Sequence, residues 1–214
     1  MARRTAFGLR IDVSEIDGLA DRLGKLTPEA VGALMVDAIN AVADKTYDLA
    51  RKTMLGGINL TDAYVQRKMQ VVHATPAKPE ASIVAFGDKP NLTGLSHYGA
   101  MVKTQSVRHP SRSRGNAATG IPAGSKSDGV SVEVIKGKRE SFKHGFFLPG
   151  KKDTEGNPLV FARKKDTNKI VSRRGPAVYM LFRVAATAIE DQVYGDLGRA
   201  VIDEAERQFQ KELS

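Results

Sequence analysis

The chain has 214 residues, of which 41% are hydrophobic and 6% aromatic, and it carries a formal net charge of +9 with no cysteine. This length fits one domain with an aliphatic core, and the lack of cysteine excludes disulfides, thiolate metal sites and cysteine nucleophiles. Neither a signal peptide nor the roughly 18 apolar residues of a membrane span is present, so we expect a soluble protein, made in a reducing compartment or indifferent to redox state, without membrane contact.

The first third of the chain predicts one short strand and two helices. Loose alternation at residues 7–13 favours the strand, and residues 14–24 favour a short amphipathic helix. Thr27 and Pro28 suit the start of a long helix ending near residue 57, about 40 Å long. We expect a helix this long to span a sheet or to pack against a neighbouring subunit. Its apolar face consists of Val31, Leu34, Met35, Ala38, Ile39, Val42 and Leu49.

The middle of the chain predicts a short helix, two strands and an irregular segment. The helix covers residues 61–68 and carries Tyr64, and the strands cover residues 69–74 and 80–86. Residues 103–129 are rich in Ser, Arg, Gly and Ala and lack periodicity. This composition predicts a flexible basic arm or insertion.

The last third predicts a β-meander followed by a helix. Strands are expected at residues 130–136, 142–148 and 159–162, with residues 170–171 continuing the last one. Pro176 opens the final helix, and Val178 and Phe182 lie on its apolar face. Gly195 and Gly198 are expected to break or bend this helix. The predicted fold is a single α+β domain, in which a small antiparallel sheet or meander packs against the two long helices.

The positive charge is concentrated in one region. Residues 103–174 contain 17 Lys and Arg against 6 Asp and Glu, whereas residues 1–102 contain 12 against 11 and residues 175–214 contain 4 against 7. Such segregation indicates contact with a polyanion, most simply the phosphates of nucleic acid, and few aromatic residues are interleaved for base stacking. The candidate contacts to DNA in a channel, or to a partner, are Arg108, Arg112, Arg114, Lys136, Lys138, Arg139, Lys151, Lys152, Lys164, Lys165, Arg173 and Arg174.

No catalytic signature is visible in the sequence. There is neither a phosphate-binding glycine loop nor a serine nucleophile motif, so we expect no enzyme activity and no cofactor. The histidines lie in separate segments without metal-ligand spacing, at His73, His97, His109 and His144. A two-carboxylate nuclease site is the weakest alternative, because no spacing selects a pair among Asp62, Asp88, Asp128, Asp153 and Asp166.

Three short motifs stand out: Ile58-Asn59-Leu60-Thr61-Asp62-Ala63-Tyr64-Val65 after the long helix, Leu159-Val160-Phe161-Ala162-Arg163, and Gly175-Pro176-Ala177-Val178 before the last helix. Together they resemble the minor tail protein Z family of tailed bacteriophages and prophages. The likeness covers roughly residues 30–190 and omits the arm. Ala177 stands where this family also uses serine.

The resemblance implies a non-enzymatic structural protein of the virion neck or tail. Such proteins complete the tail at its head-proximal end and make it competent to join the DNA-filled head. The expected partners are further copies in a ring, a tail terminator or tail tube protein, a head-side connector protein, and genomic DNA in the channel. The alternative is a sequence-independent nucleic-acid-binding accessory protein. Candidate assembly or packing residues are Leu34, Met35, Ile39, Tyr64, Val178 and Phe182.

Overall fold

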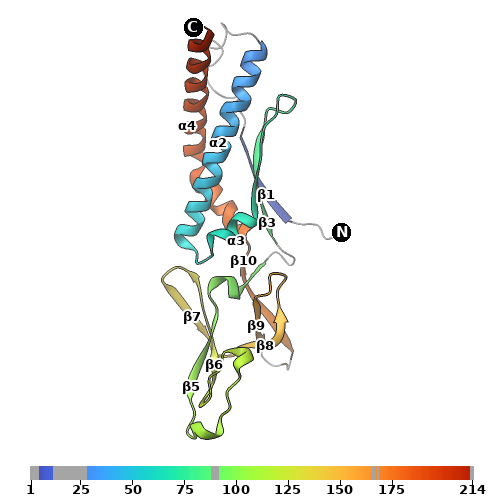
Figure 1. Cartoon of the computed structure of the whole chain (residues 1–214), viewed down its shortest axis with the longest axis vertical. Helices are drawn as coiled ribbons and strands as arrows, with labels where there is room; N and C mark the ends of the chain where they lie inside the picture. Colours follow the sequence, from blue (N-terminus) through green and yellow to red (C-terminus); the bar gives the residue numbers. More distant parts are fainter. Residues whose placement is uncertain (1–4, 12–27, 88–91, 165–166, 168, 213–214) are drawn as a thin grey trace. The chain divides into compact units, whose positions relative to one another are not determined.

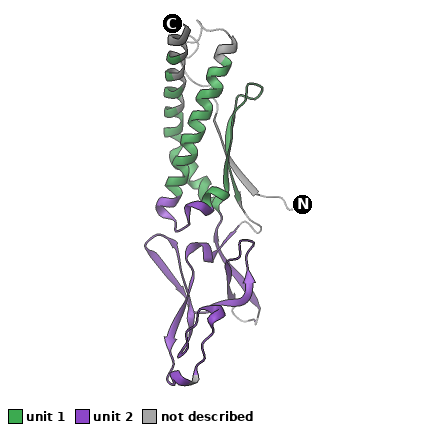
Figure 2. Ribbon diagram, in the orientation of Figure 1, with its two compact units in different colours: residues 1–54, 65–87, 178–214 green, residues 55–64, 88–177 purple. Residues whose placement is uncertain are grey.

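The structure is a computed structural model that describes residues 5–11, 28–87, 92–164, 167 and 169–212 (Figure 1). Its helices and antiparallel sheets confirm the predicted α+β class. The chain divides into two compact units (Figure 2). The first unit contains residues 1–54, 65–87 and 178–214, and the second contains residues 55–64 and 88–177. The single domain expected from the sequence stays a prediction.

The first unit combines the long helices with an antiparallel sheet of strand order β1-β3-β2. Strand β1 (Thr5–Ile11) pairs along its whole length with β3 (Ala81–Gly87), and β2 (Met69–Val72) pairs with the other edge of β3. Helix α4 (Val178–Glu212) packs against β1 and β3. Strand β3 buries Ala81, Ile83 and Ala85 in alternation, as a strand with one covered face requires.

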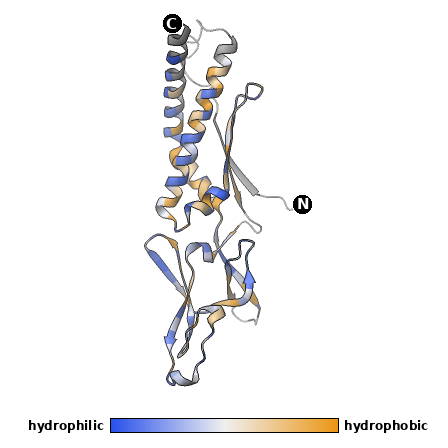
Figure 3. Ribbon diagram, viewed as in Figure 1, coloured by the Kyte–Doolittle hydropathy of each residue, from blue (hydrophilic) through white to orange (hydrophobic). Residues whose placement is uncertain are grey.

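Helix α2 (Pro28–Gly57) confirms the long helix predicted from apolar spacing. Leu34, Ile39 and Val42 are fully buried, and hydrophobic and hydrophilic residues are interspersed along the helix (Figure 3). Asn40 ties this helix to the end of β2. Its side-chain oxygen accepts a 2.7 Å hydrogen bond from the Ala74 amide, and its amide group donates a 3.2 Å bond to the Ala74 carbonyl. The amide and the carbonyl of Ala74, which lies beyond the end of β2, therefore both have a hydrogen-bond partner.

The second unit is built from two antiparallel sheets. One has the order β4-β10-β9-β8 and the other β5-β6-β7, and each includes three strands that are consecutive in sequence, as the predicted meander requires. Short helix α3 (Asp62–Arg67), which the division into units cuts after Tyr64, confirms the helix predicted around this residue. The strands are β4 (Leu92–Gly94), β5 (Met101–Ser106), β6 (Ser125–Ile135), β7 (Lys138–Phe142), β8 (Gly145–Lys152), β9 (Pro158–Arg163) and β10 (Ile170–Pro176).

Within the described residues, the sheet that packs against a long helix is β1-β3-β2, and the meander strands belong to the second unit. The sequence predicted one small sheet flanked by helices, whereas the strands form separate sheets, β1-β3-β2, β4-β10-β9-β8 and β5-β6-β7. The strand predicted at residues 142–148 is confirmed only from Gly145 onward, and it is not one continuous strand. Phe142 ends β7 and pairs with Val130, whereas Gly145 begins β8 and pairs with Ala162, so the chain changes sheets between them.

Two further boundaries differ from the prediction. Strand β8 runs through Pro149 to Lys152, because β8 lies at the edge of its sheet and an edge strand tolerates a residue without an amide hydrogen. Strand β10 is a separate strand antiparallel to β9 and does not continue it.

Helix α4 passes through Gly195 and Gly198 without interruption, since two glycines cost only about 1 kcal/mol each in a helix of this length.

The segment at residues 103–129 has more regular structure than its composition suggests. Residues 101–106 form β5, which pairs with β6 from Ser125 onward, and short 3-10 turns cover residues 110–112 and 117–119. Almost every side chain of β5 is exposed, so no apolar period marks the strand. The flexibility of this segment stays a prediction. The short helix expected at residues 14–24 lies outside the described residues, as does Val13.

Gly129 is required by its backbone and its surroundings. Its φ is +102°, and a Cβ at this position would lie 2.2 Å from the Phe142 carbonyl oxygen. We expect Gly129→Ala to lower the free energy of unfolding by at least about 3 kcal/mol, measured by denaturant unfolding. Gly137→Ala is the matched control. Gly137 also has a positive φ, +77°, but no atom within 4 Å, so only the strain of about 1–2 kcal/mol applies. Equal losses in the two variants would contradict the steric argument.

Candidate functional site

The division into units coincides with a division of charge. The second unit contains 18 Lys and Arg against 8 Asp and Glu, a net +10, and the first contains 15 against 16, a net −1. The candidate basic residues therefore all belong to the second unit. They lie mainly on strand ends and turns, where long side chains reach solvent.

The first group of candidates lies around β5, β6 and β7. Arg108 and Arg114 are exposed in the connection between β5 and β6, and Lys136 and Lys138 are exposed at the β6–β7 turn. The side chain of Arg112 lies outside the described part of the structure.

The guanidinium of Arg139 is held by several groups of the protein. It lies 3.4 Å from Glu133 and donates to the Gly99 carbonyl at 3.3 Å and to the Ser131 hydroxyl at 3.4 Å. These contacts tie β7 to β6 and to the segment before β5. Arg139 therefore has a structural role in this sheet.

The second group lies around β8, β9 and β10. Lys151 and Lys152 end β8 with exposed side chains, and Lys164 follows β9, also exposed. In β10, Arg173 is exposed and Arg174 is half-buried. Lys165 lies outside the described residues. The structure brings together two pairs of these candidates, Lys152 with Arg174 in one pocket and Lys164 with Arg173 in another.

The candidate assembly or packing residues are mostly internal. Leu34, Ile39 and Phe182 have no exposed surface, Val178 and Tyr64 are 1% and 2% exposed, and Met35 is half-buried. These side chains pack the interior of the chain itself. Tyr64 belongs to the second unit, and the other five belong to the first.

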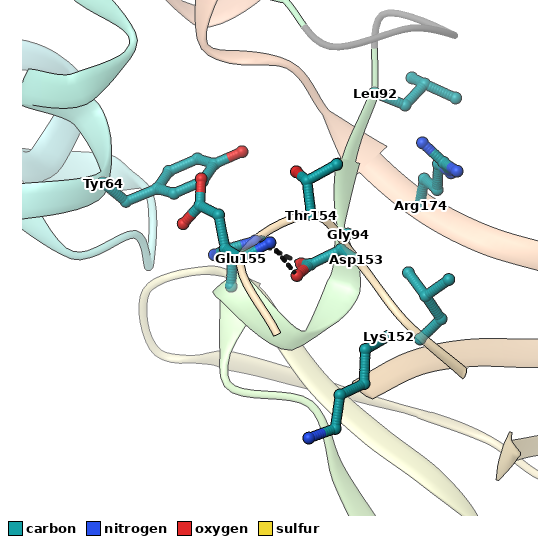
Figure 4. A pocket seen from close by; sticks show the side chains of 10 residues that line it. Tyr64, Leu92, Gly94, Lys152, Asp153, Thr154, Glu155 and Arg174 are labelled. Carbon is teal, nitrogen blue, oxygen red and sulfur yellow. Dashed lines mark hydrogen bonds and ion pairs between the residues drawn. The ribbon is translucent and has the colours of Figure 1, made fainter. Parts of the chain in front are cut away.

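A polar cluster that the sequence did not reveal lies between the β8–β9 turn and the 3-10 turn Leu95–Tyr98. His97 Nε2 lies 2.8 Å from Asp153 Oδ2, with both side chains largely buried, and the Tyr64 ring stacks on His97 at 4.1 Å between centroids. The Glu155 and Asn157 amides each donate to Asp153 at 2.9 Å. The cluster borders a pocket of about 330 Å³, which Lys152, Glu155 and Arg174 also line (Figure 4).

The contacts of Asp153 change its acidity. Burial alone would raise its pKa, but the amides of Asn157 and Glu155 together with His97 outweigh burial and hold the pKa below its ordinary value of 3.8. The Ser96 hydroxyl donates to the Pro158 carbonyl and is not directed at His97. The His97–Asp153 pair thus fastens the β8–β9 turn to the 3-10 turn.

Tyr98 makes a second attachment within this unit. Its hydroxyl donates to the Pro176 carbonyl at the end of β10, and burial raises the pKa of this phenol. Its ring lies against Gly175, where an added Cβ would come within 2.6 Å of the ring. Gly175, part of the motif before the last helix, is therefore needed for this close approach.

A groove of about 580 Å³ lies where the chain passes from β7 to β8. Phe142, Gly145 and Ala162 form its apolar part, and every charged residue that lines it is basic. The basic and histidine residues are Lys143, His144, Arg163, Lys164 and Arg173. Arg163 lies over the Phe146 ring at 5.9 Å from its centroid.

Asp153 supplies a test by pH. We expect Asp153→Ala to lose about 1.5–3 kcal/mol of unfolding free energy at pH 7, because charge-assisted hydrogen bonds are removed. The depressed pKa means that this contribution is present above pH 3.8 and disappears as pH falls through the folded-state value. Thermal unfolding should therefore separate the two proteins at pH 7 and bring them together as the pH falls well below 3.8. A constant difference across this range would contradict the assignment.

Within the described residues, no cluster of three or more His, Asp or Glu side chains is arranged to hold a metal ion. No described helix is long and apolar enough to cross a membrane. A family model for prophage minor tail protein Z matches residues 16–214 of the chain. Comparison with curated proteins and with solved structures gave no match.

Proposed function

Because the chain belongs to the prophage minor tail protein Z family and is thus a structural protein of a phage tail, we propose that it is a tail completion protein. It acts in the neck of the virion, at the head-proximal end of the tail, and prepares the tail to join the head. Copies assemble into a ring whose second units surround the DNA channel. The ring contacts a tail terminator or tail tube protein on one side and a head-side connector protein on the other.

The observation that carries this proposal is the segregation of charge between the two units. A net +10 on the second unit, with exposed Lys and Arg on its strand turns, suits a surface that follows the phosphates of DNA irrespective of sequence. Repetition around a ring multiplies the positive potential. The first unit has a net charge of −1 and long helices, which suits contacts with protein.

The proposal is tested by deleting the gene from its phage and examining the lysate by electron microscopy. We expect full heads and normal-length tails lying apart, or joined particles that fail to infect. Supplying the intact gene from a plasmid should restore infectious particles. Normal infectious particles without the gene would refute tail completion.

A free nucleic-acid-binding accessory protein is the second candidate, and the exposed basic side chains of the second unit favour it. The isolated protein would then bind short duplexes with an affinity that falls steeply with salt. Binding by the isolated protein, together with a deletion phage that assembles normally, would favour this candidate over tail completion.

A further inference from the structure

Helix α4 has two faces with different surroundings. Phe182, Ile189 and Val193 are buried on the face that packs inside the first unit. A second set of positions, spaced four and three residues apart, contains exposed apolar side chains: Met180 is 38% exposed, Val184 69% and Tyr194 54%. Spacing of this kind places residues in one stripe along a helix. We call the stripe formed by Met180, Val184, Thr187, Asp191 and Tyr194 the outer stripe.

The outer stripe is negative in its C-terminal half, and the exposed Arg183 lies beside its N-terminal half. Asp191 belongs to the stripe and Glu190 precedes it, both exposed. Two outer stripes packed in parallel would bring these carboxylates together. Parallel self-pairing of the stripe is therefore disfavoured, and a basic apolar surface is complementary to its negative half.

The groove between β7 and β8 has that complementary chemistry. It combines the 38% exposed ring of Phe142 with Lys143, Lys164 and Arg173 on its rim, and its volume of about 580 Å³ is sufficient for large side chains such as Tyr194 and Val184. Apolar residues at the centre with charges around them are typical of specific protein contacts. The groove and the outer stripe share no residue.

We propose that the outer stripe of one copy docks into the β7–β8 groove of the next copy. Such a contact is heterologous, so it builds a ring where the rotation closes and a filament where it does not. Only the closure of this contact into a ring rests on the proposed function. The contact also divides the basic residues of the second unit into two sets. Lys143, Lys164 and Arg173 bind the neighbouring subunit, whereas the strand-turn residues outside the groove remain for DNA.

Charge reversal on each surface tests the contact. We expect the full-length protein to self-associate with rising concentration in sedimentation velocity at low salt. Reversing the groove (Lys164→Glu with Arg173→Glu) or the stripe (Glu190→Lys with Asp191→Lys) should weaken association at least about tenfold. Mixing the two reversed proteins should restore association between them, because the stripe of each variant then meets a groove of opposite charge on the other. The matched control reverses Lys138 and Lys151, exposed lysines outside the groove, and should associate normally.

Three outcomes would overturn the inference. One is a wild-type protein that stays monomeric at every concentration, and another is a mixture of reversed proteins that does not associate. The third is a groove variant that loses duplex DNA binding while its self-association is unchanged, which would make the groove a nucleic-acid site. Each variant is also used to complement the deletion phage. A variant that no longer self-associates but still restores normal head joining would show that this contact is not needed in the virion. Tail completion itself would then stand.

Discussion

Phe182→Asp should prevent the first unit from folding. Phe182 has no exposed surface and lies in the first turns of α4, the helix that packs on β1 and β3. An unpaired carboxylate in such a site, together with the lost aromatic packing, costs at least about 5 kcal/mol. That loss is comparable to the whole stability of a domain, about 5–15 kcal/mol. Circular dichroism should show loss of helix, and cooperative thermal unfolding should disappear.

Val184→Asp is the matched control for this result, because it introduces the same carboxylate two positions along the same helix. Val184 is 69% exposed, so the new charge remains in water and the helix should fold with a stability within about 0.5 kcal/mol of wild type. Similar unfolding of both variants would contradict the assignment of a buried and an exposed face to α4. A folded Phe182→Asp protein would contradict it too.

The elements that the sequence predicted are those whose pattern arises within one segment. Helix α2 buries Leu34, Ala38 and Ile39 at the expected spacing, and β3 buries alternate residues, because each element has one face against a core. The exposed strand β5 has no such face, and β4 is only three residues long, so neither leaves a readable pattern. The change of sheet between Phe142 and Gly145 depends on long-range pairing, which periodicity does not contain.

The candidate site shows the same limit. The excess of basic residues is a property of composition and was visible in the chain. The His97–Asp153 pair joins residues 56 apart, and no motif or spacing in the sequence connects them. The β7–β8 groove likewise combines residues at the ends of β7, β8 and β9 with Arg173 of β10. Folding together of distant segments, and not any local motif, creates these sites.

Reversing three exposed lysines of the second unit should remove infectivity without unfolding the protein. Lys136, Lys138 and Lys151 lie on strand turns and ends, outside the groove. Each replacement by Glu removes one positive charge and adds one negative charge, so the net charge of the second unit falls from +10 to +4. Exposed substitutions of this kind change stability by about 0.5 kcal/mol or less apiece.

The measurement is complementation of the deletion phage. If the ring surrounds DNA, the same change recurs in every copy, and the summed potential of the channel falls far more than that of one subunit. We expect the triple variant to give a plaque count close to that of the empty plasmid. The control reverses Lys45, Lys52 and Lys78, exposed lysines of the first unit, with the same total charge change, and should complement normally. Equal loss in both would show that net charge matters and its location does not, which would remove the case for a DNA-facing second unit.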